Sequence, residues 1–135
     1  MLGATAADWR AAVRVAGDAL VAAGAAKPAY ADEMIRMIEE HGPYVVIAPG
    51  LALAHARPGP AVLADGLAIV TLAEPVAFGH PHNDPVRVVL ALSILTADEH
   101  LAAVAGLANV FNDSSAIEDL AEATTTGEVQ RIMRG

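Results

Sequence analysis

Four short, nearly uninterrupted apolar runs dominate the middle of this chain. They are YVVIA (44–48), GLALA (50–54), LAIVTLA (67–73) and VRVVLALSIL (86–95). Proline, glycine, asparagine or aspartate residues bound them, as is typical of strands. Runs without polar alternation suit strands that helices cover on both faces. The runs therefore predict a central sheet between two helical layers.

Amphipathic helices are predicted before these strands. The first covers residues 5–24 and carries an apolar stripe of Trp9, Val13, Ala16 and Leu20. The second begins near Pro28 and ends at Gly42-Pro43. Its spacing turns five side chains inward: Tyr30, Met34, Met37, Ile38 and His41.

Further helices are predicted after the strands. Two capping boxes, Thr96 with Glu99 and Ser115 with Glu118, open helices over 97–110 and 115–124. A last short helix is expected over 127–134. Helices, then strands, then helices within 135 residues predict an α/β fold. We expect one compact domain over residues 1–135, with a central mixed β-sheet flanked by helices on both faces.

Charge and composition exclude several classes of protein. The formal net charge is -8 and the eight Lys and Arg residues are scattered, so the basic footprint of a nucleic-acid binder is missing. No apolar run reaches the roughly 20 residues that a membrane span needs. The chain has no cysteine, which fits a cytoplasmic location. The high apolar content permits a homodimer, although no apolar stripe demands one.

One titratable ring interrupts the apolar signal of the strands. In GLALAHARPGP (50–60), His55 follows four apolar residues and Arg57 lies two residues on. A neutral imidazole is a good nucleophile near neutral pH, and a guanidinium offers a planar fork to phosphoryl oxygens. A core histidine beside a surface arginine is the other interpretation of this stretch alone.

A second segment rich in histidine, VAFGHPHNDPVRV (76–88), leads into the last apolar run. His80 and His82 flank a proline in it. Asn83 and Asp84 can accept a ring N–H and so determine which imidazole nitrogen is free. A simple turn before Pro85 is the alternative interpretation of the same two residues.

A metal site is the weaker interpretation of these histidines. His-x-His suggests a metal, but residues 86–89 are Val-Arg-Val-Val and supply no further ligand. The other two histidines, His41 at a helix end and His100 inside a helix, are interpreted as structural residues. No phosphate-binding GxxxxGK[ST] loop occurs in the sequence, so this nucleotide-binding motif is missing.

The stretch EHGPYVVIAPGLALAHA (40–56) resembles the active-site signature of enzyme IIA domains of the sugar phosphotransferase system (PTS), mannitol/fructose type. Eight positions fit it: Glu40, Ile47, Ala48, Leu51, Ala52, Leu53, His55 and Ala56. Ala54 departs from it, because the family usually has proline there. APGLALAHARP (48–58) and FGHPHNDPVRVVLALS (78–93) are similar to the ascorbate-type branch, and the resemblance covers essentially the whole chain.

The resemblance implies a phosphocarrier. His55 stands at the phosphorylated histidine, which would take a phosphoryl group from the phosphohistidine of the carrier protein HPr. It would pass that group to a IIB component, for uptake of an ascorbate-like sugar through a membrane IIC permease. His80 stands at the second active-site histidine and would donate to the phosphoryl oxygens, with Arg57 in support and Asn83 and Asp84 holding His80. The resemblance implies neither a metal nor a nucleotide cofactor, because the phosphoryl group arrives already activated and its transfer needs positioned donors.

Three other functions are compatible with the same residues. The chain can be a regulatory IIA-type protein that signals by its phosphorylation state, or a non-catalytic binding domain on the same scaffold. It can also be a metal-binding protein that uses His55, His80 and His82. The sequence leaves open the sugar, the oligomeric state, the role of His82, the effect of Ala54 and the ring nitrogen of His55 that carries the phosphoryl group.

Overall fold

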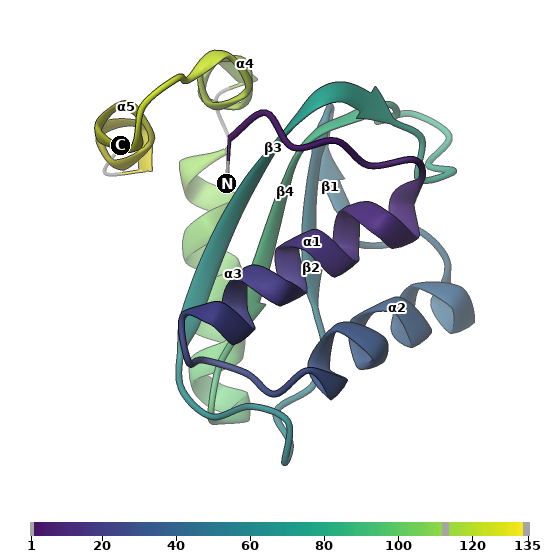
Figure 1. The fold of residues 1–135 in the computed structure, drawn as a ribbon, viewed down its shortest axis with the longest axis vertical. Helices are drawn as coiled ribbons and strands as arrows, with labels where there is room; N and C mark the ends of the chain where they lie inside the picture. The colour runs from purple at the N-terminus through teal and green to yellow at the C-terminus, as the bar shows by residue number, and fades with distance from the viewer. Residues whose placement is uncertain (1, 112–113, 134–135) are drawn as a thin grey trace.

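The computed structural model of the protein describes residues 2–111 and 114–133, apart from the side chains of residues 97, 100, 108, 110 and 114. The helices and strands found there follow the order α1 (Trp9–Ala22), α2 (Ala29–His41), β1 (Val46–Ala48), β2 (Leu51–His55), β3 (Gly66–Val76), β4 (Val86–Ser93), α3 (Ala97–Val110), α4 (Ser114–Glu122) and α5 (Thr126–Met133). The predicted α/β fold with a mixed sheet is confirmed (Figure 1). None of the described helices is long and apolar enough to cross a membrane.

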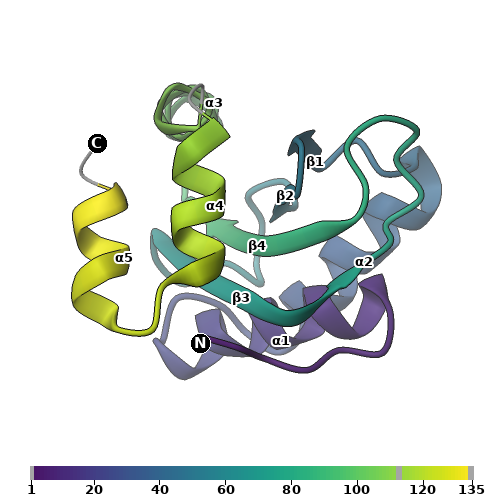
Figure 2. The same cartoon turned by 90° about the horizontal axis from the view of Figure 1, so that it is seen from above.

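The sheet has the strand order β1-β2-β4-β3. Strand β2 runs parallel to β4, with Leu51 opposite Val88 and His55 opposite Leu92. The two outer pairs, β1 with β2 and β3 with β4, are antiparallel. Helices α1 and α2 cover one face, and α3 and α4 cover the other, with α5 beside α4 (Figure 2). Both helical layers predicted from the apolar runs are therefore present.

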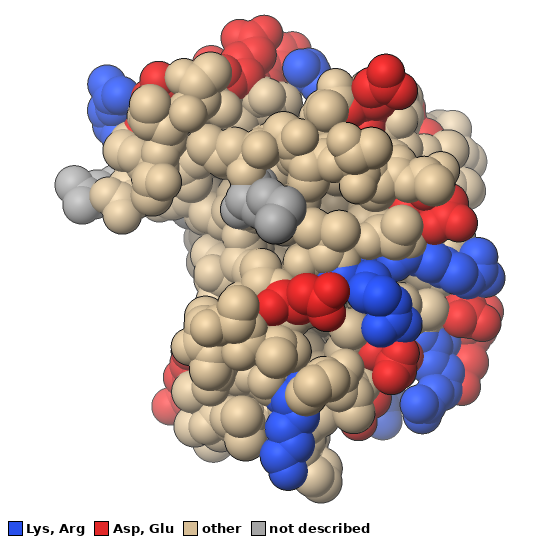
Figure 3. All heavy atoms as spheres, in the orientation of Figure 1, with Lys and Arg blue, Asp and Glu red and all other residues tan. Residues whose placement is uncertain are grey.

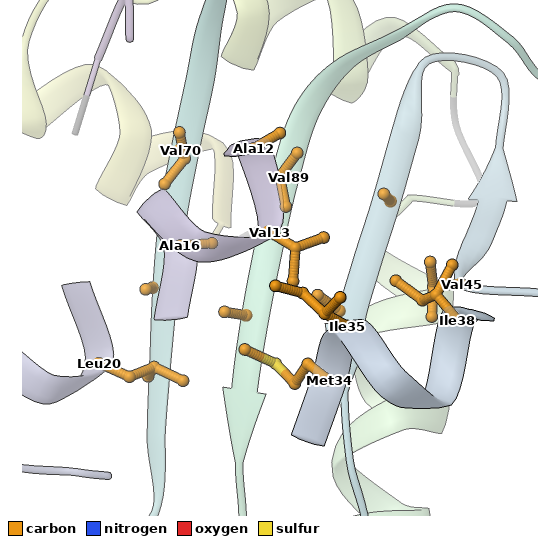
Figure 4. Close-up of a cluster of buried hydrophobic side chains, with 14 of the residues drawn as sticks. Ala12, Val13, Ala16, Leu20, Met34, Ile35, Ile38, Val45, Val70 and Val89 are labelled. Atoms are coloured by element: carbon orange, nitrogen blue, oxygen red, sulfur yellow. The ribbon is translucent and has the colours of Figure 1, made fainter. Parts of the chain in front are cut away.

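Alternation along β2 and β4 divides the interior into two cores. The alanines of these strands, Ala52, Ala54 and Ala91, belong with Val89 to the core that faces α1 and α2. Figure 4 shows Val89 beside side chains of these helices. Larger ones, Leu51, Leu53, Val88, Leu90 and Leu92, pack on the other side with residues of α3 and α4. Because successive side chains of a strand point to opposite faces, the ring of His55 points toward the α3 side.

The first helix begins later than predicted. It starts at Trp9 rather than at residue 5, because the Asp8 carboxylate caps it by accepting the Ala11 N–H at 2.8 Å. The residues before it extend the sheet instead, since the Ala4 N–H donates to the Thr71 carbonyl at 2.8 Å. At the end of α2, His41 is exposed beside Glu40 and does not point inward as predicted.

The caps of the later helices are partly as predicted. The Thr96 hydroxyl accepts the Glu99 N–H at 3.3 Å, and α3 has the predicted bounds. Helix α4 begins at Ser114, so Ser115 lies inside it rather than at the predicted N-cap. Helix α5 starts at Thr126, where Thr125 accepts the Glu128 N–H at 3.2 Å. The predicted end of that helix, residue 134, lies outside the described residues.

Charged side chains of both signs are interleaved over α1 and α2, and no wholly basic patch is visible on this face (Figure 3). Two ion pairs join the helices there. Arg10 lies 3.8 Å from Glu39, and Arg14 lies 2.6 Å from Asp32. Both pairs are exposed, so water and salt screen them and they contribute little to stability. Packing of apolar side chains therefore holds α1 and α2 together.

The first prediction concerns that packing. A methyl group added at Gly17 of α1 would lie 2.7 Å from the Ala31 Cβ of α2. Gly17→Ala should therefore lower the free energy of unfolding by about 1–3 kcal/mol, measured by urea denaturation, although alanine is the better helix former. Gly106→Ala in α3 is the matched control, because nothing lies within 4 Å of the added carbon. An equal gain in stability in both variants would contradict the close contact.

Candidate functional site

His55 is the last residue of β2 and is partly buried. Its Nδ1 lies 2.8 Å from the Leu53 carbonyl oxygen. A carbonyl oxygen only accepts hydrogen bonds, so Nδ1 must carry the hydrogen, and the lone pair of the neutral ring is then on Nε2. The main chain of β2 thus determines which ring nitrogen carries the hydrogen.

An aromatic ring and an arginine lie at the same end of β2. The Tyr44 and His55 rings meet edge to face, with centroids 5.6 Å apart. Partial burial raises the pKa of Tyr44, and the positive charge of Arg57 opposes that rise. Arg57 therefore lies close enough for its charge to act at this ring, and it forms no ion pair with the other described residues.

A groove of about 390 Å³ adjoins this end of β2. The residues after His55, from Ala56 to Gly59, form one side of it, and the outer face of α2 forms the other. Arg36, Arg57 and His41 bring basic groups to it, while Glu33 and Glu40 bring acidic ones. His55 itself does not line this groove, which begins at the next residue, Ala56. The groove is open and carries charges of both signs, which suits contact with another protein more than enclosure of a small molecule.

Helix α3 begins at the same end of the sheet (Figure 1). Leu92, the partner of His55 in β4, is followed by a short connection in which Thr96 caps α3. His100 is the fourth residue of that helix, so its backbone belongs to this end of the molecule. Its side chain is outside the described set, and the interpretation of His100 as a structural residue is not tested.

The histidine-rich loop has a well-defined hydrogen-bond network of its own. The Asp84 carboxylate accepts the N–H groups of Phe78, Gly79 and His80 at 3.0, 2.7 and 3.1 Å. The His80 Nδ1 accepts the N–H groups of His82 and Asn83 at 3.1 and 3.0 Å. Asp84 and Asn83 therefore contact His80, but neither side chain accepts a ring N–H: Asp84 accepts the His80 backbone N–H, and the Asn83 backbone N–H donates to the ring. The hydrogen of the neutral His80 ring is then on Nε2.

This loop lies at the opposite end of β2 from His55. The Gly50 N–H, just before β2, donates to the Asn83 carbonyl at 3.0 Å. His55 follows five residues later, about 16 Å away at the usual rise of a strand. The expectation that His80 donates to a phosphoryl group on His55 is therefore wrong within one chain. The same separation removes His55 from any metal site with His80 and His82, and the described residues hold no group of three His, Asp or Glu that could bind a metal.

Sequence reasoning missed α3 as a part of this end of the molecule. The sequence shows the order of the run VRVVLALSIL (86–95), the Thr96 cap and His100, but not the direction in which that run pairs with β2. Carboxyl ends of parallel strands meet at one edge of a sheet. The runs GLALA (50–54) and VRVVLALSIL (86–95) pair in parallel. This pairing brings the residues after 95, rather than those before 86, to the end of the sheet at which His55 lies.

Known proteins share both the sequence and the architecture. The chain matches, over residues 1–135, the family described as phosphoenolpyruvate-dependent sugar phosphotransferase system, EIIA 2. It is 38% identical over 129 residues to the ascorbate-specific PTS system EIIA component of Shigella boydii, which covers 95% of this chain and 84% of that protein.

Two solved structures show the same fold. The crystal structure of IIA mannitol from Escherichia coli superimposes with a TM-score of 0.85 at 30% identity, over 98% of this chain and 94% of that one. The IIA–IIB mannitol complex from Escherichia coli, with phosphorylated IIB, matches with a TM-score of 0.86 at 29% identity, over 100% and 93%. This chain belongs to the PTS enzyme IIA family, whose members are phosphotransferases that carry a phosphohistidine.

The second prediction concerns the loop at the far end. Asp84→Ala leaves three backbone N–H groups without their acceptor, so it should lower the free energy of unfolding by about 1–3 kcal/mol. Thermal unfolding measures this loss, and hydrogen exchange at residues 78–80 should accelerate. Asp32→Ala is the control, because it removes only the exposed ion pair with Arg14 and should change stability much less. Unchanged exchange in Asp84→Ala would contradict the network.

Proposed function

We propose that this chain is the IIA phosphocarrier of an ascorbate-type PTS, and that His55 is its phosphorylated residue. The observation that carries the proposal is the position of His55 at the end of β2, with its Nδ1 hydrogen held 2.8 Å from the Leu53 carbonyl oxygen. The nucleophilic nitrogen is thereby defined before any partner binds. The identity to ascorbate-specific EIIA components supports the branch.

The donor is the phosphohistidine of HPr and the acceptor is a IIB component. The Nε2 lone pair of His55 attacks phosphorus, and the bond from phosphorus to the HPr nitrogen breaks in line with it. That nitrogen keeps the bonding pair. The phosphorylated ring of His55 gains positive character, which the hydrogen bond from Nδ1 to the Leu53 carbonyl stabilises. The reverse displacement passes the group to IIB, and the IIA–IIB complex of the mannitol system supports that partner.

Arg57 and α3 supply positive charge around the phosphoryl group in this proposal. Arg57 acts from the groove side, and the first turn of α3 directs backbone N–H groups toward the same end of the sheet. The backbone position of His100 at this end of the sheet supports it as the second histidine of the site in place of His80. A relay that draws on HPr places the chain in the cytoplasm and couples it to a membrane IIC permease.

A regulatory protein of the same fold is the second candidate. The nitrogen regulatory protein IIA-Ntr of Neisseria meningitidis matches with a TM-score of 0.83 at 25% identity. The ascorbate-specific relatives are 38% identical, which favours the carrier. A carrier passes its phosphoryl group to an ascorbate-type IIB protein within seconds, whereas a purely regulatory protein retains it.

The third prediction tests the carrier residue and its neighbours. Phosphorylated HPr is mixed with each variant, and the product is followed by intact mass. His55→Ala should take no phosphoryl group because the nucleophile is gone. His100→Ala should be slowed roughly 100-fold, which is typical when a donor to the transition state is lost.

His80→Ala is the matched control, since the same substitution lies at the opposite end of β2 and should transfer at the wild-type rate. Labelling of His55→Ala at the wild-type level would remove His55 from its role. A slow His80→Ala with a fast His100→Ala would reverse the assignment of the second histidine.

The fourth prediction concerns the nitrogen that reacts. Protein labelled with ¹⁵N in histidine and phosphorylated by HPr should show phosphorus coupled to Nε2 of His55 in NMR spectra, with the hydrogen still on Nδ1. Nδ1 of His55 is the donor to Leu53, so it has no lone pair to offer. Phosphorus coupling to Nδ1 would show that the ring turns over before transfer.

A further inference from the structure

Tyr30 of α2 is a buried polar residue next to the end of β2. Its side chain is among the largest that are fully buried. The hydroxyl donates to the Leu92 carbonyl at 2.6 Å and accepts the Ala56 N–H at 3.1 Å. The Ala56 carbonyl lies farther away, at 3.3 Å. A hydroxyl has one hydrogen to give, so the shorter contact, to Leu92, is its main donor bond.

These two partners define where the hydroxyl acts. Leu92 is the residue opposite His55 in β4, and Ala56 is the residue directly after His55. The described ladder between β2 and β4 ends at the pair His55 and Leu92. The Tyr30 hydroxyl therefore joins the two strands at the point where their own backbone pairing stops.

The backbone of His55 is held from both sides in this way. Before it, the Leu53 N–H donates to the carbonyl of Val45, the residue just before β1, at 2.8 Å. After it, the Ala56 N–H donates to Tyr30. Burial raises the pKa of Tyr30, so the hydroxyl keeps its hydrogen at neutral pH. The His55 side chain is therefore attached to the backbone between two hydrogen-bonded residues, Leu53 and Ala56.

We infer that Tyr30 is a positioning residue for phosphoryl transfer: its hydroxyl holds the Ala56 and Leu92 backbone so that the His55 Nε2 is aimed at the incoming phosphorus. This inference rests on the proposed function of His55. Phosphoryl transfer depends mainly on alignment, and a displacement of about 1 Å can cost roughly 100-fold in rate.

Ala54 makes this restraint more important. Proline would limit the backbone just before the histidine by its ring, but Ala54 has no such limit and simply continues the strand opposite Ala91. Rigidity at this point must then come from hydrogen bonds. Tyr30 supplies them from the α2 side of the sheet, while the ring of His55 points to the α3 side, so the hydroxyl does not need to touch the phosphoryl group.

The test compares Tyr30→Phe with Thr71→Val. Both substitutions remove one buried hydroxyl and keep nearly the same shape. Thr71 accepts the Gly3 N–H at 2.8 Å and lies opposite Val88, four residues along β4 from Leu92. It therefore controls for a loss of stability far from His55. Single-turnover transfer from phosphorylated HPr is measured over a range of HPr concentrations for both variants and the wild type.

We expect the maximal transfer rate of Tyr30→Phe to fall roughly tenfold or more, with a half-saturating HPr concentration that changes less than twofold. Thr71→Val should keep the wild-type rate. The ¹⁵N spectrum of the His55 ring should show a single Nδ1–H tautomer in the wild type and in Thr71→Val, and a mixture of tautomers in Tyr30→Phe. Replacement of Tyr30 by 4-aminophenylalanine restores a donor to the Leu92 carbonyl and should recover most of the transfer rate. This variant also tests the inference if Tyr30→Phe does not fold.

A wild-type rate in folded Tyr30→Phe would overturn the inference, as would an equal loss in Thr71→Val. Failure of the wild type to accept phosphoryl groups from HPr would instead overturn the proposed function. In that case the tautomer spectra still decide whether Tyr30 holds His55. Unchanged spectra in Tyr30→Phe would then reject the positioning role, and mixed tautomers would support it.

Discussion

The parallel pairing of β2 with β4 is the constraint on which the rest of this structure depends. It brings the carboxyl ends of both strands, and therefore His55 and Leu92, to one edge of the sheet. The chain leaves β4 at that edge and enters α3 there. It arrives at the other edge through the loop that contains His80. The direction of one strand pair thus decides which parts of the chain surround His55 and which are kept away from it.

The two faces of this strand pair carry side chains of different size and pack against different helices. The alanines on one face leave room for α1 and α2 to lie close to the sheet, which is why a tyrosine hydroxyl from α2 can reach main-chain groups of both strands. The leucines on the other face fill the larger space beneath α3 and α4. His55 stands at the end of this alternation. Hydrogen bonds from Tyr30 of α2 hold the backbone next to it, while its ring points toward the α3 side of the sheet.

Much of this architecture could be predicted from sequence because its causes are local. The apolar runs identified the strands, and the Thr96 cap defined the start of α3 because a hydroxyl and the third N–H after it lie within a single turn. The later start of α1 depends on the Asp8 carboxylate, a cap of the same kind that the apolar periodicity concealed. His55 stood out because a titratable ring interrupted an apolar strand. The error over His80 has a different origin. Which strands pair, and in which direction, depends on contacts between residues far apart in the chain, and neither composition nor spacing near His80 records them.

The acceptor of the His55 hydrogen is a main-chain carbonyl rather than a side chain. Whatever its side chain, every residue type at position 53 has a backbone carbonyl oxygen. No single substitution there therefore deletes this acceptor. The strand backbone itself determines which nitrogen of the neutral His55 ring carries the hydrogen. Side chains around the histidine can therefore change without removing the acceptor of its ring hydrogen.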